Sequence, residues 1–195
     1  AKRIFVYSKS TELTFFRAAN DWAFPIHFFL AKTGVRPGEA AHLLIEEVDL
    51  DAGWMEIRNK RDLGWRIKTG RERRIPLIDE VVQVLRRVIG SRTAGPVFVR
   101  EKFKVEGSSL ANTPYDRLIA AAARRIAAAE GDEKTSLTRE QQSRVFRGVW
   151  RDAGVLRRDA IRNSFMRINA DVGLPTATCP KSWRHSFATL LQDAN

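Results

Sequence analysis

One short region with β-strand character, set among helical patterns, constrains the fold of this chain more than any other feature. Residues 54–57 alternate between apolar and polar side chains, 64–67 form a second short extended segment, and 73–77 close the set. Such alternation over a few positions is typical of half-buried strands. Thr69-Gly70-Arg71 fits a tight turn between the last two segments. We therefore predict a fold that is mainly α with a small three-stranded antiparallel β-sheet (α+β).

Helical patterns cover most of the other residues. Ser10-Thr11-Glu12 offers N-cap candidates for the apolar-rich stretch 13–30, which Pro25 is expected to split or kink. Gly34 fits a helix C-cap, and Pro37 fits the first turn of a helix that runs to about Ile45. Further helices are expected over 81–89 after an Asp79 cap, 115–129, 139–150 after a Thr138 cap, 159–170 and 182–191. The polar run 130–133 is expected to be an exposed connection.

Composition narrows the class of protein. The length of 195 residues and the apolar share of 44% allow one domain, or one domain with a large insertion. Cys179 is the only cysteine, so no disulfide framework exists and a reducing cytosol is the expected compartment. Three scattered histidines form no metal-ligand constellation, and the longest apolar run, 23–31, is too short to span a bilayer. No signal peptide opens the chain, and its start at Ala1 suggests an excised fragment.

The charge is strongly basic and unevenly distributed. The formal net charge is +11 and the sequence pI is about 10.5, an excess that usually indicates a polyanionic partner such as nucleic acid. The alternative is a solvated basic surface. Residues 56–74 and 139–167 each hold eight basic and three acidic side chains, which accounts for nearly the whole excess. This clustering favours a binding face.

Three motifs carry candidate chemistry. Thr33-Gly34-Val35-Arg36-Pro37-Gly38-Glu39 places Arg36 at a loop-to-helix junction with Glu39 one turn further along. On its own, this motif is better explained as an ordinary helix start, with the glutamate at the positive end of the helix dipole. The stretch from Lys68 to Leu77 places a lysine at a hairpin tip, where it can reach a phosphodiester. A basic, exposed hairpin is an equally good interpretation of that stretch by itself.

The third motif, Lys181-Ser182-Trp183-Arg184-His185-Ser186-Phe187-Ala188-Thr189, is the most specific. If Ser182 opens a helix, Lys181 lies at its start and Arg184 projects one turn further in. The alternative is a plain amphipathic helix with a basic first turn, which the helix dipole disfavours.

In this order, the three motifs resemble the signature of the tyrosine recombinase (phage integrase) family. The resemblance covers roughly residues 13–89 and 165–195. It implies the fold of a tyrosine recombinase (DNA breaking-rejoining enzyme) catalytic domain. Residues 1–195 would be a single integrase-like catalytic domain that is incomplete at its C-terminus. The stretch 103–162 is longer than the family's usual connection, and we interpret it as a helical, arginine-rich insertion that adds DNA-backbone contacts.

The resemblance also implies roles for individual residues. Arg36 and Arg184 would clamp the phosphate, and Lys68 would protonate the leaving 5′ oxygen. Lys181 occupies the position usually held by histidine, with Glu39 and His185 as supporting residues. The residues expected to contact DNA are Lys60, Arg66, Arg71 and Arg73. Lys60 also competes with Lys68 for the acid role, but Lys68 aligns better with the Pro76-Leu77 anchor.

This set of residues suits transesterification at a phosphodiester. The transition state is crowded and carries charge on its non-bridging oxygens, which two planar guanidinium groups can hold at once. Arginines that neutralise this charge make a metal unnecessary, so we expect no metal and no cofactor. Lysine at position 181 is a departure, because it accepts a proton less readily than histidine near neutral pH.

The nucleophilic tyrosine is the largest departure. In the family it follows the second arginine by a few tens of residues, whereas this chain ends eleven residues after Arg184. Tyr7 and Tyr115 stand in the wrong order and context, and Tyr115 is expected to be a packing residue. We therefore expect this fragment alone to bind DNA without cleaving it.

The resemblance implies site-specific DNA recombination or integration through a 3′-phosphotyrosyl intermediate, in a phage or mobile-element protein. The expected partner is double-stranded DNA, with a homo-tetramer on paired sites for the parent protein and a monomer for this fragment. A cytoplasmic, nucleoid-associated location follows, with no membrane partner. One alternative is a non-catalytic, sequence-specific DNA-binding protein with a degenerate recombinase fold. An RNA-binding module is a weaker one, because no aromatic-rich sheet motif supports it.

Overall fold

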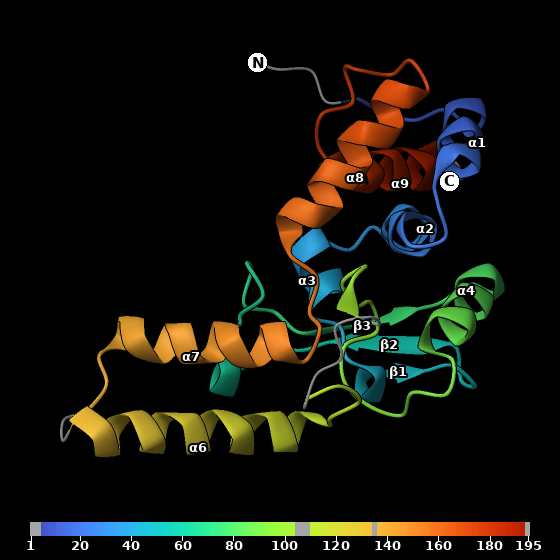
Figure 1. Ribbon diagram of the computed structural model, residues 1–195. Coiled ribbons are helices and arrows are strands. Elements are labelled where there is room, and N and C mark those ends of the chain that lie inside the picture. The colour runs from blue at the N-terminus through green and yellow to red at the C-terminus, as the bar shows by residue number, and fades with distance from the viewer. Residues whose placement is uncertain (1–4, 104–109, 134–135, 194–195) are drawn as a thin grey trace.

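The computed structural model describes residues 5–103, 110–133 and 136–193, and it arranges them as a helical region, a small sheet and a projecting helical hairpin (Figure 1). The helices are α1 (Lys9–Ala18), α2 (Ala23–Thr33), α3 (Pro37–Ala41), α4 (Asp79–Ile89), α6 (Tyr115–Glu133), α7 (Arg139–Asp152), α8 (Arg158–Asp171) and α9 (Lys181–Asp193). The strands are β1 (Val48–Asp49), β2 (Trp54–Ile57) and β3 (Arg73–Pro76), and the 3-10 turns are η1 (Ile45–Glu47) and η2 (Arg61–Leu63).

The sheet is antiparallel with the order β1-β2-β3, and Met55 pairs with Val48 on one side and with Ile75 on the other. The predicted fold class is confirmed, but one predicted strand is wrong. Residues 64–67 form a loop whose only strand-like contact is an isolated bridge from Trp65 to Lys60. Their backbone groups are used inside the loop: the Ile67 N–H, for example, donates to the side chain of Asn59. The third strand is β1, which precedes β2 in the chain.

Each predicted helix has a counterpart among the described residues, but the ends differ. The stretch 13–30 does divide into two helices, but the break precedes Pro25, which lies in the first turn of α2 where proline is tolerated. The helix expected to reach Ile45 ends at Ala41. The run 130–133, expected to be a connection, continues α6 to Glu133. Thr138 caps α7 through its side chain, as predicted.

The main core surrounds α2, which packs against α1, α4, α8 and α9. Trp183, Phe15 and Phe165 are fully buried there. His27 lies among them, and burial lowers its pKa to about 3. The neutral ring accepts a hydrogen bond from the Trp183 indole at Nδ1 and donates from Nε2 to Ser164 Oγ. Helix α9, which carries the third motif, is thereby fixed to the centre of the protein.

A second, smaller core belongs to the α6–α7 hairpin. Leu118, Ala121 and Ala122 of α6 pack with Val149 and Trp150 of α7. This cluster also contains Leu44 and Leu63, so the hairpin is attached to the sheet region through η2. Of the expected insertion 103–162, residues 104–109 lie outside the described part. Its end belongs to α8, which packs in the main core through Ile161. Within the described residues, no helix is long and apolar enough to cross a membrane.

Substituting Gly34 with alanine should weaken the docking of α9 on α2. Gly34 has φ of 62°, and an added Cβ would lie 2.5 Å from Cδ1 of Phe187 on α9. Left-handed strain and overpacking together predict a loss of about 2–4 kcal/mol in unfolding free energy, measured by urea denaturation. Gly70→Ala is the matched control, because Gly70 has φ of 70° and no atom within 4 Å of an added Cβ. Its expected loss is about 1 kcal/mol, and equal losses for the two variants would contradict the clash with Phe187.

Candidate functional site

The end of α2 brings the first and third motifs together. Gly34 closes the helix in a left-handed conformation, which turns the chain towards Arg36. From α9, Arg184 Nη1 donates a hydrogen bond to the Gly34 carbonyl at 3.1 Å. The two arginines, far apart in the sequence, are therefore joined through a backbone position two residues from Arg36.

The carboxylate of Glu39 binds two arginine side chains in this region. Its side chain is 2% exposed and accepts hydrogen bonds from the backbone N–H of Arg36 at 2.9 Å and from Arg36 Nη1 at 3.0 Å. Arg73, the first residue of β3, binds the same carboxylate with Nη2 at 2.6 Å and Nη1 at 3.2 Å. Burial opposes ionisation of Glu39, but the hydrogen bonds and charges of Arg73 and Arg36 outweigh it, so its pKa is lowered. Glu39 is therefore a charged anchor that links α3 to β3.

Lys68 lies on the loop that joins β2 to β3. The Gly70 N–H donates to the Ile67 carbonyl at 2.9 Å, which closes a tight turn with Lys68 and Thr69 at its centre. Lys68 is exposed on this turn, and Arg66 and Arg71 are exposed on either side of it. We call the loop between β2 and β3, which carries Lys68, the lysine loop. Because β3 begins with Arg73, the ion pair from Arg73 to Glu39 fixes the end of this loop next to α3.

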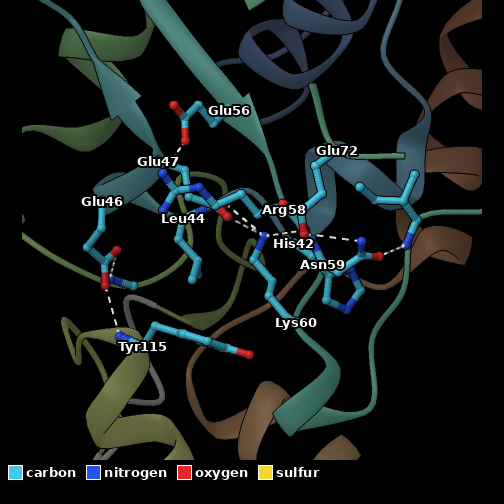
Figure 2. Close-up of polar contacts among 12 residues, drawn as sticks. His42, Leu44, Glu46, Glu47, Glu56, Arg58, Asn59, Lys60, Glu72 and Tyr115 are labelled. Atoms are coloured by element: carbon cyan, nitrogen blue, oxygen red, sulfur yellow. Dashed lines mark hydrogen bonds and ion pairs between the residues drawn. The ribbon is translucent and has the colours of Figure 1, made fainter. Parts of the chain in front are cut away.

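The structure corrects one of the residues expected to contact DNA, Lys60, and gives a second one, Arg73, a carboxylate partner. Lys60 is buried, and its Nζ lies 2.7 and 2.8 Å from the two carboxylate oxygens of Glu47 (Figure 2). Burial raises the pKa of Glu47 and lowers that of Lys60, since removal from water disfavours both charges more than their attraction favours them. Lys60 is thus an internal anchor. Arg73 is committed to Glu39 and supports the site from one side.

The residues expected on α9 are at its exposed first turns. Lys181 is the first residue of the helix, Arg184 lies one turn further on, and His185 follows it, all on the solvent side. Lys181 and Arg184 thus place two cationic side chains at the exposed start of α9, where the N–H groups of Ser182 and Trp183 already bind the carbonyls of Cys179 and Pro180. In the part of the chain that the structure describes, no three His, Cys, Asp or Glu side chains are grouped to hold a metal ion.

Both tyrosines have packing roles. Tyr7 is buried, stacks on Trp183 and donates its hydroxyl hydrogen bond to Asn169. Burial raises its pKa. Tyr115 stacks on Trp150 in the hairpin core.

Sequence reasoning missed three contributors. Arg73 was assigned to DNA rather than to Glu39, the carbonyl of Gly34 carries no side-chain signal, and Asn59 was not considered. Asn59 accepts from the Ile67 N–H and donates to the Gly70 carbonyl, so it holds both ends of the lysine turn. A lone asparagine between a strand and a basic loop is compatible with many turns, so only the folded structure shows which backbone groups it binds.

Comparisons with known proteins agree with this arrangement. Residues 17–195 match the model of the phage integrase family. No curated protein matches the sequence.

Solved recombinases share the fold at low sequence identity. XerA recombinase is similar with a TM-score of 0.59 at 16% identity, and the Tn1549 transposon integrase in complex with transposon right-end DNA with 0.62 at 16%. The same integrase with a circular intermediate DNA gives 0.60 at 18%. Each match covers 100% of this chain and 52%, 55% and 55% of the other chain, respectively, so this chain spans about half the length of those proteins.

The charge on Glu39 should stabilise the fold in a pH-dependent way. Because its folded pKa is lowered, its contribution is complete above the unfolded pKa of about 4.5 and is lost as pH falls through the folded pKa. Glu39→Gln should therefore cost about 2 kcal/mol at pH 7, and the difference from wild type should shrink below about pH 4.5. Urea denaturation between pH 3 and 7 measures both. Glu56→Gln, which removes a surface partner of Arg58, should cost under about 0.5 kcal/mol throughout; a pH-independent loss in Glu39→Gln would refute the role of charge.

Proposed function

The chain belongs to the phage integrase family, and from its site we propose that it carries out site-specific DNA recombination or integration by strand cleavage and rejoining. The residues of this chain would hold one phosphodiester and protonate the 5′ oxygen that leaves it. The observation that carries the proposal is the junction at Gly34, whose carbonyl Arg184 binds from α9 two residues from Arg36.

The proposed step can be followed atom by atom. A tyrosine oxygen attacks phosphorus and forms a 3′-phosphotyrosyl bond, while the bond from phosphorus to the 5′ oxygen breaks. Arg36 and Arg184 bind the non-bridging oxygens and favour the charge that develops on them. Lys68 gives its proton to the 5′ oxygen, and Lys181 binds the phosphate from the start of α9. Rejoining reverses these events, with a 5′-hydroxyl as the attacking group.

The attacking tyrosine is proposed to come from outside these 195 residues. Tyr7 and Tyr115 are committed to packing, as their stacking on Trp183 and Trp150 shows. His185, exposed beside Arg184, is available to support the phosphate-binding side chains. A homo-tetramer on paired sites in the cytoplasm is the assembly that we infer for the parent protein from the family resemblance.

Double-stranded DNA is the proposed partner, and the arginines of α7 and α8 extend its surface. Arg144, Arg147 and Arg151 are exposed on the side of α7 that faces away from its buried residues. Arg158 begins α8, and its Cδ lies 3.6 Å from where a Cβ would stand at Gly38, two residues from Arg36. Figure 1 shows α7 and α8 leaving their junction in different directions, with α3 beside that junction. We propose that a duplex at the site contacts both helices.

A non-catalytic DNA-binding protein is the second candidate. The lysine at position 181, where the family usually has histidine, favours it. The buried charge on Glu39 favours the enzyme, because a pure DNA-binding surface does not require an internal carboxylate that orients one arginine.

A small added nucleophile can test the site without the tyrosine. On a duplex selected for tight binding from a randomised pool, hydrogen peroxide should take the place of tyrosine and cleave the strand at one phosphate. Arg36→Ala or Arg184→Ala should slow this cleavage about 10²–10³-fold and weaken DNA binding much less. Equal losses in cleavage and binding would mean that these arginines only position DNA, and absence of cleavage by the wild-type chain would favour the second candidate.

The role of Lys68 should be visible in the leaving group. Lys68→Ala should slow peroxide cleavage by about 100-fold, since an alkoxide leaves poorly without a proton. Replacing the 5′-bridging oxygen with sulfur should restore the rate, because a thiolate leaves unprotonated. The same sulfur substitution should not restore the cleavage rate of Arg36→Ala. Failure of sulfur to restore Lys68→Ala would refute the acid role.

DNA affinity should depend steeply on salt, with a slope of about −0.9 in log K against log salt for each phosphate contact. Changing Arg144, Arg147 and Arg151 to glutamine should make the slope shallower by about 2.7. The matched control changes Arg17, Arg86 and Arg87, exposed on α1 and α4 away from α7, and should leave the slope unchanged. Fluorescence anisotropy between 50 and 300 mM salt measures it; an unchanged slope in the α7 variant would remove α7 from the interface.

A further inference from the structure

We propose that Asn59 is a positioning residue that sets the place of Lys68 at the scissile phosphate. The proposal rests on the acid role of Lys68 proposed above. Its basis is a pair of hydrogen bonds from one side chain to the two ends of the turn that carries Lys68, together with a buried anchor directly after Asn59.

The amide of Asn59 brackets the turn. Its Oδ1 accepts from the Ile67 N–H at 2.9 Å, and its Nδ2 donates to the Gly70 carbonyl at 3.2 Å. Ile67 and Gly70 are also bonded to each other across the turn. Gly70 has φ of 70°, a conformation that L side chains adopt at a cost. Lys68 therefore projects from a turn whose entry and exit are both fixed by one planar group.

Asn59 is itself held at the end of β2. Its backbone N–H and its Nδ2 donate to Oε1 of Glu72, at 2.9 and 3.1 Å, which closes the loop across its base (Figure 2). These bonds lower the pKa of Glu72, the backbone bond from Asn59 most of all. The carboxylate thus fixes Asn59 without a cation in direct contact with it.

The next residue, Lys60, attaches the loop to the interior of the protein. Its backbone pairs with Trp65 in both directions at 3.0 Å, and its ammonium binds Glu47 in the protein interior. Trp65 stacks on His42, whose burial lowers its pKa to about 4 and keeps the ring neutral. Lys60 therefore fixes the backbone position from which the Asn59 side chain projects.

The α6–α7 hairpin completes the support. Trp150 Nε1 donates to the Leu63 carbonyl at 2.9 Å, and the Phe146 ring lies within 2.9 Å of where a Cβ would stand at Gly64. The lysine loop is thus held between the hairpin and the sheet. A proton donor must lie within hydrogen-bond reach of the oxygen it serves, and misplacement by about 1 Å can cost 10²-fold in rate. Asn59 sets the part of the loop nearest to that donor.

Hydrogen exchange in the 195-residue chain tests whether Asn59 holds the turn that carries Lys68. In Asn59→Ala, the NMR water-exchange rate of the Ile67 amide should rise about 5–10-fold because the amide loses its acceptor, and that of the Gly70 amide, which donates to the Ile67 carbonyl, should rise as the turn opens. Amides of α2 should be unchanged. The control is Asn112→Ala: the Asn112 side chain accepts from the Thr93 and Ala94 amides in another loop, so the lysine turn should keep its wild-type rates. Unchanged rates at Ile67 and Gly70 in Asn59→Ala would overturn the proposal.

Peroxide cleavage tests the consequence for Lys68. Asn59→Ala should slow cleavage of the oxygen-bridged duplex about 10-fold, and sulfur at the 5′-bridging position should restore the rate, as for Lys68→Ala. A variant that is merely destabilised would cleave the oxygen-bridged and the sulfur-bridged duplex more slowly by the same factor. Asn112→Ala should cleave both duplexes at the wild-type rate. If sulfur restores Lys68→Ala but not Asn59→Ala, the positioning role is wrong and the proposed function stands. If the wild-type chain cleaves neither duplex, the proposed function fails, and the exchange rates still decide whether Asn59 holds the turn.

Discussion

The carboxylate of Glu39 is the interaction on which the site depends. An ionised side chain that is 2% exposed is costly unless it is paired, and here two guanidinium groups and one backbone N–H meet that requirement. The pairing has a geometric result, because Arg36 belongs to the start of α3 and Arg73 to the start of β3. The same buried charge therefore aligns α3 with the strand that follows the lysine loop. Removing it would release both elements at once.

Local sequence patterns predicted the parts of this site that depend on near neighbours. The glycine that ends α2 and the Thr138 cap are interactions within one turn, so spacing alone reveals them. The prediction of a strand at residues 64–67 was wrong because these residues do not bind a neighbouring strand. The backbone of Trp65 binds that of Lys60, and the Ile67 N–H donates to the side chain of Asn59. Burial of Lys60 depended on Glu47, thirteen residues earlier, which no charge count identifies.

The basic excess of the chain thus has two physical uses that composition does not separate. Lys60 and Arg73 form ion pairs with buried carboxylates, and each pair fixes one end of a loop. Arg66, Arg71 and the arginines of α7 keep theirs in water, where it can attract a polyanion from a distance. The hairpin serves both uses: Trp150 and Phe146 support the lysine loop on one side of α7, while Arg147 and its neighbours are exposed on the other.

Arg36 and Arg184, the two arginines proposed to bind phosphate, are held in place to different extents. A guanidinium group has five N–H donors, and one bond leaves most of them for a ligand. Arg36 gives Nη1 to a carboxylate, a charge-assisted bond that resists displacement, whereas Arg184 gives Nη1 to a neutral carbonyl. A phosphate can compete with that carbonyl more easily than with the carboxylate. In the proposed clamp, Arg36 would therefore be the fixed half, and Arg184 would be the half that turns towards the phosphate.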